Sequence, residues 1–216
     1  MGGISDEHVE WAVVNRLKAM LDDPPATPFN VTQSFAHFTT ILLWTKNRMW
    51  VAGNAGDRIE WADPADGLAH GARERLREKI IFDDPWCLST RLPRLAEAGA
   101  EGLDGRINSD FEGMTAEAFF KWLRDALAHG DGRTIRPVHK QSFRDGKTWL
   151  AGFEIEFEEY RKAPRMLTLT LHHEDIKRLG RLLADEFCRS LSGGDQYFEE
   201  EAGTAAILEA GTSRAA

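Results

Sequence analysis

The sequence has little cysteine and no long hydrophobic run. Its two cysteines, Cys87 and Cys188, are far apart and belong to no Cys-x-x-Cys pair. This spacing indicates neither a zinc framework nor a disulfide scaffold, so we expect two buried, inert thiols. No apolar run approaches the ~20 residues that cross a bilayer, and the acidic start MGGISDEHVE lacks the apolar region of a signal peptide. We therefore expect a cytoplasmic protein with no membrane partner.

Positive charge is also in deficit. The chain has 27 Lys and Arg residues against 35 Asp and Glu residues, a formal net charge of −8. This balance argues against a protein that coats nucleic acid through bulk electrostatics, but it leaves room for a small local basic site. Because no internal repeat or linker divides the chain, we expect a single domain over residues 1–192. A polar tail over residues 193–216 is expected to form a short helix and then to be disordered.

The common catalytic and nucleotide-binding motifs are missing as well. There is no Gly-x-Ser-x-Gly, His-Glu-x-x-His or Gly-x-Gly-x-x-Gly. The string DGKT at 145–148 resembles the end of a phosphate-binding loop, but the loop's first glycine is absent and a hairpin turn is favoured. The string HHED at 172–175 contains metal-ligand types, yet adjacent strand residues point to opposite faces. We expect no metal and no cofactor.

Hydrophobic periodicity predicts a mainly helical chain. The expected helices cover residues 5–22, 30–51, 68–82, 89–98, 115–129 and 174–191. The segment 30–51 is apolar on nearly all sides and is therefore expected to be the central helix, with His37 a satisfied core or edge histidine. The alternating charges over 73–79 favour a solvated, salt-bridged face over a nucleic-acid surface.

The period of the pattern changes after residue 130. Apolar and charged residues alternate over 149–158 and again over 167–172, which predicts two half-buried strands. Asp145-Gly146 is a tight-turn dipeptide, so Val138 to Phe143 could pair back as a third strand. The fold class predicted is mainly α: a helical bundle with a small antiparallel β meander inserted over about 138–172.

One stretch has the residue types of a catalytic site. Trp122 to Gly130 reads WLRDALAHG, the end of a helix that Gly130 is placed to close. Histidine is suited to proton transfer at neutral pH, and arginine offers a permanent charge and a planar fork of donors that matches phosphate oxygens. RNA supplies its own nucleophile, the 2′-hydroxyl, so Arg124 and His129 are a sufficient minimal set for cleaving it without a metal.

Helix geometry limits how these residues can act together. Residues five apart point about 140° apart on an ideal helix, so Arg124 and His129 of one chain do not share a face. They converge if His129 leaves helical geometry at Gly130, or if two chains share one site, which we favour. Asp125 lies four residues before His129 and faces it, so it could orient the imidazole. The plain alternative is a histidine that meets the helix dipole beside a surface arginine.

The stretch LRDALAHG resembles the defining motif of the HEPN superfamily, in which an Arg, a polar residue and a short spacer ending in His lie near a helix end. The expected architecture from Ser5 to Leu191 is similar too, since a helical bundle with a small β insertion after the motif occurs among plasmid- and phage-associated members. The resemblance implies a metal-independent endoribonuclease that acts as a homodimer with a composite site, in a toxin–antitoxin or antiviral defence role. An antitoxin protein is then a further partner.

The resemblance also implies roles for individual residues. Arg124 would contact the scissile phosphate, Asp125 would organise the motif and His129 would act in proton transfer. Asp125 replaces the commoner Asn and is within the family's range. The residues that follow the motif either supply local positive charge for RNA near the cleft or form a solvated loop: Arg133, Arg136, His139 and Lys140. A second reading is a non-catalytic module that binds a nucleotide, RNA or protein through the same cleft.

Overall fold

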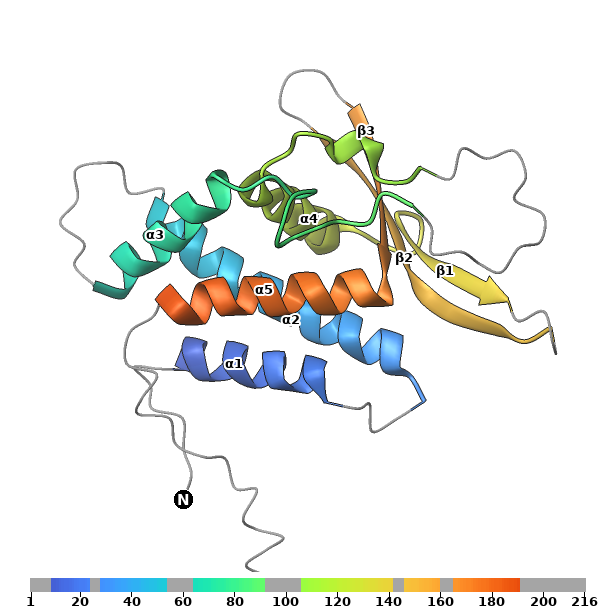
Figure 1. Ribbon diagram of the computed structural model, residues 1–216, viewed down its shortest axis with the longest axis horizontal. Coiled ribbons are helices and arrows are strands. Elements are labelled where there is room, and N and C mark those ends of the chain that lie inside the picture. The colour runs from blue at the N-terminus through green and yellow to red at the C-terminus, as the bar shows by residue number, and fades with distance from the viewer. Residues whose placement is uncertain are drawn as a thin grey trace, which may run out of the picture.

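The computed structural model describes residues 9–23, 28–53, 64–91, 106–141, 146–159 and 165–190. Within these ranges lie five α-helices, one short 3-10 helix and three strands (Figure 1). The helices are α1 (Val9–Asp22), α2 (Asn30–Gly53), α3 (Pro64–Arg77), η2 (Ser109–Phe111), α4 (Ala116–His129) and α5 (His173–Ser190). The strands are β1 (Ile135–Gln141), β2 (Thr148–Glu159) and β3 (Arg165–His172). The predicted mainly helical fold with a three-strand insertion is confirmed at this level.

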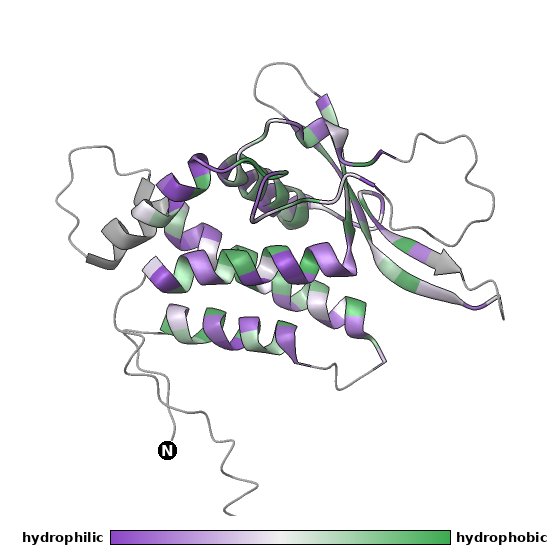
Figure 2. Ribbon diagram, in the orientation of Figure 1, coloured by the Kyte–Doolittle hydropathy of each residue, from purple (hydrophilic) through white to green (hydrophobic). Residues whose placement is uncertain are grey.

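Helix α2 is central, as its apolar circumference predicts. It packs against α1, α3, α4, α5 and strand β2. Figure 1 shows α1, α2 and α5 together on one side of the molecule, with the sheet at the N-terminal end of α5. Phe38, Ile41 and Leu42 of α2 are fully buried among residues from the neighbouring helices. Figure 2 shows hydrophobic residues over much of α4 and alternating hydrophobic and hydrophilic positions along α5, the pattern of a helix with one exposed face.

The sheet is an antiparallel meander in the order β1-β2-β3. Its apolar face packs on the helices: Phe153 stacks on Phe35 of α2, with ring centroids 4.1 Å apart, and Ile155 is fully buried. Gly152 lies opposite His172 in the β2–β3 register. A Cβ atom there would lie 2.0 Å from the Leu171 carbonyl oxygen, so only glycine allows the strands to approach this closely.

The segment before α4 covers the outer edge of β3. Asn108 accepts a hydrogen bond from the Thr170 amide at 2.7 Å and donates to the Thr170 carbonyl at 3.0 Å. Asp110 accepts from the Thr168 amide at 3.1 Å and pairs with Arg165. These side chains take the place of a further strand, which satisfies an edge that would otherwise be open to pairing with another chain.

Several boundaries differ from those predicted from the sequence. Helix α3 ends at Arg77, not at Phe82, because Ile80 forms a β-bridge with Thr115 and Ile81 donates to the Met114 carbonyl. The first residues of the helix predicted over 89–98 are not helical, and Arg91 bridges to Arg106. Both corrections have one cause: the chain pairs with the segment that leads into α4. The predicted tail at 193–216 lies outside the described residues.

The charged face predicted at 73–79 is partly interior. Arg73 is 9% exposed, donates to Glu117 of α4 at 3.0 Å and lies over the Trp50 ring, 5.3 Å from its centroid. Arg75 pairs with Glu186 of α5, and Arg77 pairs with Glu74. The salt bridges are present, but the prediction of a solvated face is wrong for Arg73, which tertiary packing buries against a partner carboxylate.

The two cysteines differ in exposure. Cys188 is half-buried, and burial raises the pKa of its thiol to about 12, which favours the protonated form. Cys87 is exposed, so the prediction of a buried thiol is wrong there. Among the described residues, no helix is long and apolar enough to cross a membrane.

Candidate active site

Helix α4 is fixed at both ends, and this determines where the candidate residues lie. The Thr115 hydroxyl accepts from the Ala118 amide at 3.2 Å, and Phe119, Phe120 and Leu123 are fully buried. The helix ends at Gly130, as predicted, although with φ −74° and not in the left-handed conformation of a glycine cap. The glycine has a steric role instead, since a Cβ atom there would lie 2.7 Å from the Ala126 carbonyl oxygen and 2.6 Å from the Ile135 side chain.

Arg124 and Asp125 form an ion pair that reaches helix α2. Arg124 Nη1 donates to Asp125 Oδ1 at 2.9 Å, and Lys46 Nζ lies 3.7 Å from the same oxygen. The Arg124 and Asp125 side chains are 29% and 34% exposed, so solvent reaches both. Burial lowers the pKa of Lys46, and its Asp125 neighbour raises it while Arg124 and Lys121 lower it further. Asp125 therefore pairs with Arg124 and with a lysine from another helix.

His129 has different neighbours from the Arg124–Asp125 ion pair. It is exposed at the end of α4, and its ring lies nearly parallel to that of Phe157 in β2, at 6.2 Å between centroids and 11° between planes. No hydrogen bond joins His129 to Asp125 within the described part of the chain, where the carboxylate pairs with Arg124 and Lys46 instead. The expectation that Asp125 orients the imidazole is wrong in the single chain, because two cations compete for its oxygen.

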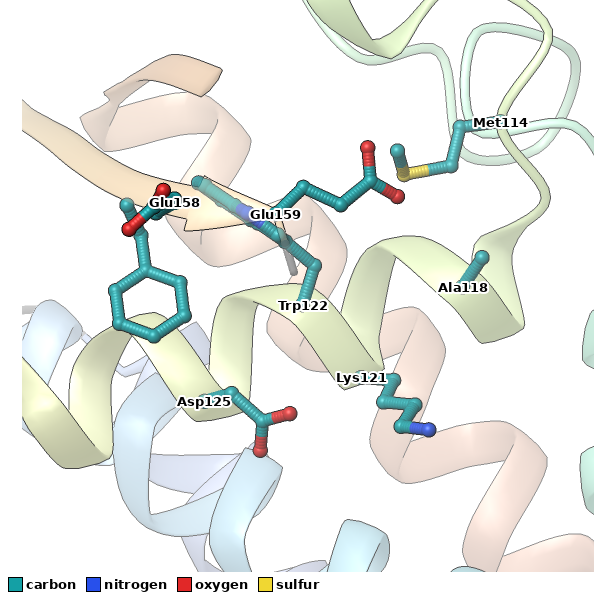
Figure 3. A pocket seen from close by; sticks show the side chains of 8 residues that line it. Met114, Ala118, Lys121, Trp122, Asp125, Glu158 and Glu159 are labelled. Atoms are coloured by element: carbon teal, nitrogen blue, oxygen red, sulfur yellow. The ribbon is translucent and has the colours of Figure 1, made fainter. Parts of the chain in front are cut away.

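A pocket of about 240 Å³ lies between α4 and the end of β2 (Figure 3). Asp125 and Lys121 point to one side of α4, while Glu158 and Glu159 line the pocket from the strand (Figure 3). Phe157 lines the pocket and also stacks on His129, so the pocket adjoins the end of the candidate motif. Its walls are apolar at Trp122, Met114 and Ala118, and acidic on the strand side.

The basic residues after the motif are largely neutralised. Arg133 donates to Asp131 from its side chain at 2.6 and 2.9 Å, and this pairing lowers the pKa of Asp131 to about 2. Arg136 pairs with Glu154 and Glu156 of the neighbouring strand. His139 is exposed on β1, and the Lys140 backbone belongs to the same strand. The alternative of a solvated loop fits Arg133, whose side chain is 90% exposed in the turn before β1, but it is wrong for Arg136, His139 and Lys140, since residues 135–141 form a strand. The paired carboxylates reduce the local positive charge that was expected.

Two residues at the site escaped prediction from the sequence. Lys46 precedes Arg124 by more than seventy residues, and nothing in its spacing relates it to Arg124. Phe157 was predicted as a strand residue of the apolar face, but its contact with His129 depends on how β2 packs against α4. Neither contact has a signal in local periodicity, because both are set by tertiary packing.

Among the residues that the structure describes, no group of three or more His, Cys, Asp or Glu residues is arranged to hold a metal ion. His172 is buried, whereas His173 lies 3.0 Å from the Ser34 hydroxyl through its Nε2. The two neighbours diverge, as expected for the junction of a strand and a helix.

Comparison with known proteins gives no relative to transfer a function from. No family model, curated protein or solved structure matches the chain.

Proposed function

We propose that this protein is a metal-independent endoribonuclease of the HEPN type that cleaves RNA by attack of the 2′-hydroxyl. The observation that carries the proposal is the placement of Arg124 and His129 at one end of α4, with both side chains open to solvent and Arg124 held by Asp125. The resemblance of the motif to that of the HEPN superfamily is what supports a role in a toxin–antitoxin or antiviral system, with an antitoxin as the partner protein.

The reaction needs one proton removed and one returned. A neutral His129 would take the proton of the 2′-hydroxyl. The 2′-oxygen would then form a bond to the adjacent phosphorus. The 5′-oxygen would leave and take the proton back from the imidazolium, which gives a 2′,3′-cyclic phosphate and a 5′-hydroxyl end. The guanidinium of Arg124 would offset the charge that builds on the phosphoryl oxygens.

A two-chain site is the arrangement that best accommodates the geometry. Arg124 pairs toward α2 and His129 stacks on β2, so within one chain they diverge. A two-fold axis beside the end of α4 would bring the Arg124 of one chain to the His129 of its partner, in an isologous homodimer with two equal sites.

The test is cleavage of several RNAs by the purified protein in the presence of a chelator. Wild type is expected to give products that end in a 2′,3′-cyclic phosphate, and Arg124→Ala and His129→Ala are expected to abolish them. An RNA with a single 2′-deoxy substitution at the mapped cleavage position should resist. Equal cleavage by wild type and both variants would overturn the proposal.

A second candidate is a non-catalytic module that binds RNA, a nucleotide or a protein at the same place. The divergence of Arg124 and His129 within one chain favours it. This candidate predicts saturable binding that depends on Arg124, with no product at high protein concentration.

A further inference from the structure

The cations on the α2 side of α4 outnumber the carboxylate that holds them. Arg124 and Lys46 both approach Asp125 Oδ1, at 2.9 and 3.7 Å, and this oxygen carries at most one negative charge. Lys121 is one helical turn before Asp125 on the same side of α4 (Figure 3). No ion pair in the described ranges engages Lys121. Two cations therefore share one carboxylate, and the charge of Lys121 acts on Lys46 as well.

Such an excess is unfavourable unless an anion relieves it. The Lys46 side chain is only 12% exposed, and the helix places it against like charges at a point where water screens them weakly. The buried stem of Lys46 also fixes its ammonium, which lies 6.0 Å from the centroid of the Trp50 ring. The cluster is thus held in place before any ligand arrives, and a fixed arrangement of donors reduces the entropy lost on binding.

We propose that Lys46, Lys121 and Arg124 form one anion-binding cluster about Asp125, and that it takes a phosphodiester phosphate of the RNA chain. In this cluster Lys46 is a positioning residue that holds Asp125, while Arg124 and Lys121 face the phosphate. Glu158 and Glu159 line the strand side of the pocket that Lys121 and Asp125 line from α4, so a phosphate is repelled from that side and is expected toward α2. The inference rests on the proposed function for the identity of the ligand.

The direct test is titration of a fluorescent RNA oligonucleotide with 2′-O-methyl groups, which lacks the nucleophile and cannot be cleaved. Lys121→Met is expected to weaken binding roughly tenfold, the loss of one charged contact, and to lower the slope of log affinity against log salt by about one. Lys46→Met is expected to weaken binding several-fold, because Asp125 and Arg124 lose the ammonium that positions them, with a smaller change in the salt slope. Lys46→Arg should restore most of the affinity, because it keeps the charge beside Asp125.

Lys18→Met is the matched control. Lys18 of α1 pairs with Asp185 of α5, which is also a Lys–Asp pair between two helices. No further cation pairs with Asp185 in the described structure. This variant should bind the oligonucleotide like wild type, and thermal unfolding should show that all variants are folded. Unchanged affinity and salt slope in folded Lys46→Met and Lys121→Met would overturn the inference, as would equal weakening by Lys18→Met.

The same proteins separate this inference from the proposed function. If wild type binds the 2′-O-methyl oligonucleotide in a Lys46-dependent way but leaves unmodified RNA intact, the anion cluster stands and the proposed cleavage fails. If wild type cleaves RNA and Lys46→Met cleaves it with the same KM and kcat, the cleavage stands and the cluster fails.

Discussion

Arg124 and His129 leave helix α4 in different directions. Arg124 pairs with Asp125 beside Lys46 of α2, whereas the His129 ring stacks on Phe157 of β2. This divergence agrees with the angle of about 140° that five residues of regular helix predict, because α4 stays helical through His129. This divergence makes the number of chains at the site the first question for experiment.

A composite site predicts complementation between two inactive variants. Arg124→Ala and His129→Ala, coexpressed in equal amounts, should form heterodimers in which one of the two sites is complete, because its arginine and histidine come from different chains. Random pairing would then restore about a quarter of wild-type cleavage. RNA cleavage by the purified mixture, with each variant alone as the control, measures this. A mixture no more active than its components would place the whole site within one chain.

The stacking of Phe157 on His129 predicts a selective loss of cleavage. Phe157→Leu keeps an apolar residue but removes an aromatic contact worth roughly 0.5–1.5 kcal/mol, so the imidazole should lose its fixed orientation and kcat should fall several-fold. Phe153→Leu is the control, since Phe153 stacks on Phe35 and does not contact His129. Cleavage rates are compared after both variants are shown to be folded. Equal losses in the two would assign Phe157 a structural role alone.

Gly130 predicts a strong steric effect where α4 meets β1. Gly130→Ala places a Cβ atom within 2.7 Å of the Ala126 carbonyl oxygen and 2.6 Å of the Ile135 side chain, so overpacking should destabilise the fold by about 1–3 kcal/mol. Gly132→Ala, two residues on, meets nothing within 4 Å and should change stability little. Urea unfolding of both variants gives the comparison. A neutral Gly130→Ala would mean that the helix end shifts freely.

The buried pair of Arg73 and Glu117 predicts a large effect from an unpaired charge. Both side chains are 11% exposed, so Glu117→Ala should cost about 3–5 kcal/mol by leaving the guanidinium buried alone. Glu112→Ala removes the partner of Arg106 in a pair that is 68% and 54% exposed, and it should cost less than about 1 kcal/mol. Free energies of unfolding in urea test the ratio. Similar losses from the two pairs would contradict the role assigned to burial.

His172 predicts a loss of stability at mildly acidic pH. Burial lowers its pKa below the ordinary 6.5, although Asp175 raises it, and neither ring nitrogen has a hydrogen-bond partner in the described structure. Below pH 6.5 the unfolded chain binds a proton that the folded chain does not, so stability falls as the pH drops from 6.5 toward the folded pKa. His172→Leu should reduce this dependence, measured as unfolding free energy against pH. An unchanged slope would exclude His172 as a source.

Local pattern predicted the fold well where one face of an element is apolar. The Thr115 cap and the buried run of α4 were expected from residue types, as was the alternation of β2 and β3. The prediction erred at residues 78–82 and 89–91, which are not helical, and Ile80 pairs with Thr115 across the chain. Such pairings override helical propensity because they satisfy backbone groups and bury Ile81 at once, and no local window contains both partners.

The sequence by itself determined the motif, the helix that carries it and the angle between Arg124 and His129, because all three follow from regular helical spacing. It also determined the meander after the motif, since apolar and charged residues that alternate with a period of two are typical of a half-buried strand. Only the tertiary structure decided the partners of those side chains: Lys46 for Asp125, Phe157 for His129, and carboxylates for Arg133 and Arg136. Contacts between distant segments depend on how whole elements pack, and packing is a property of the assembled surfaces rather than of any one stretch.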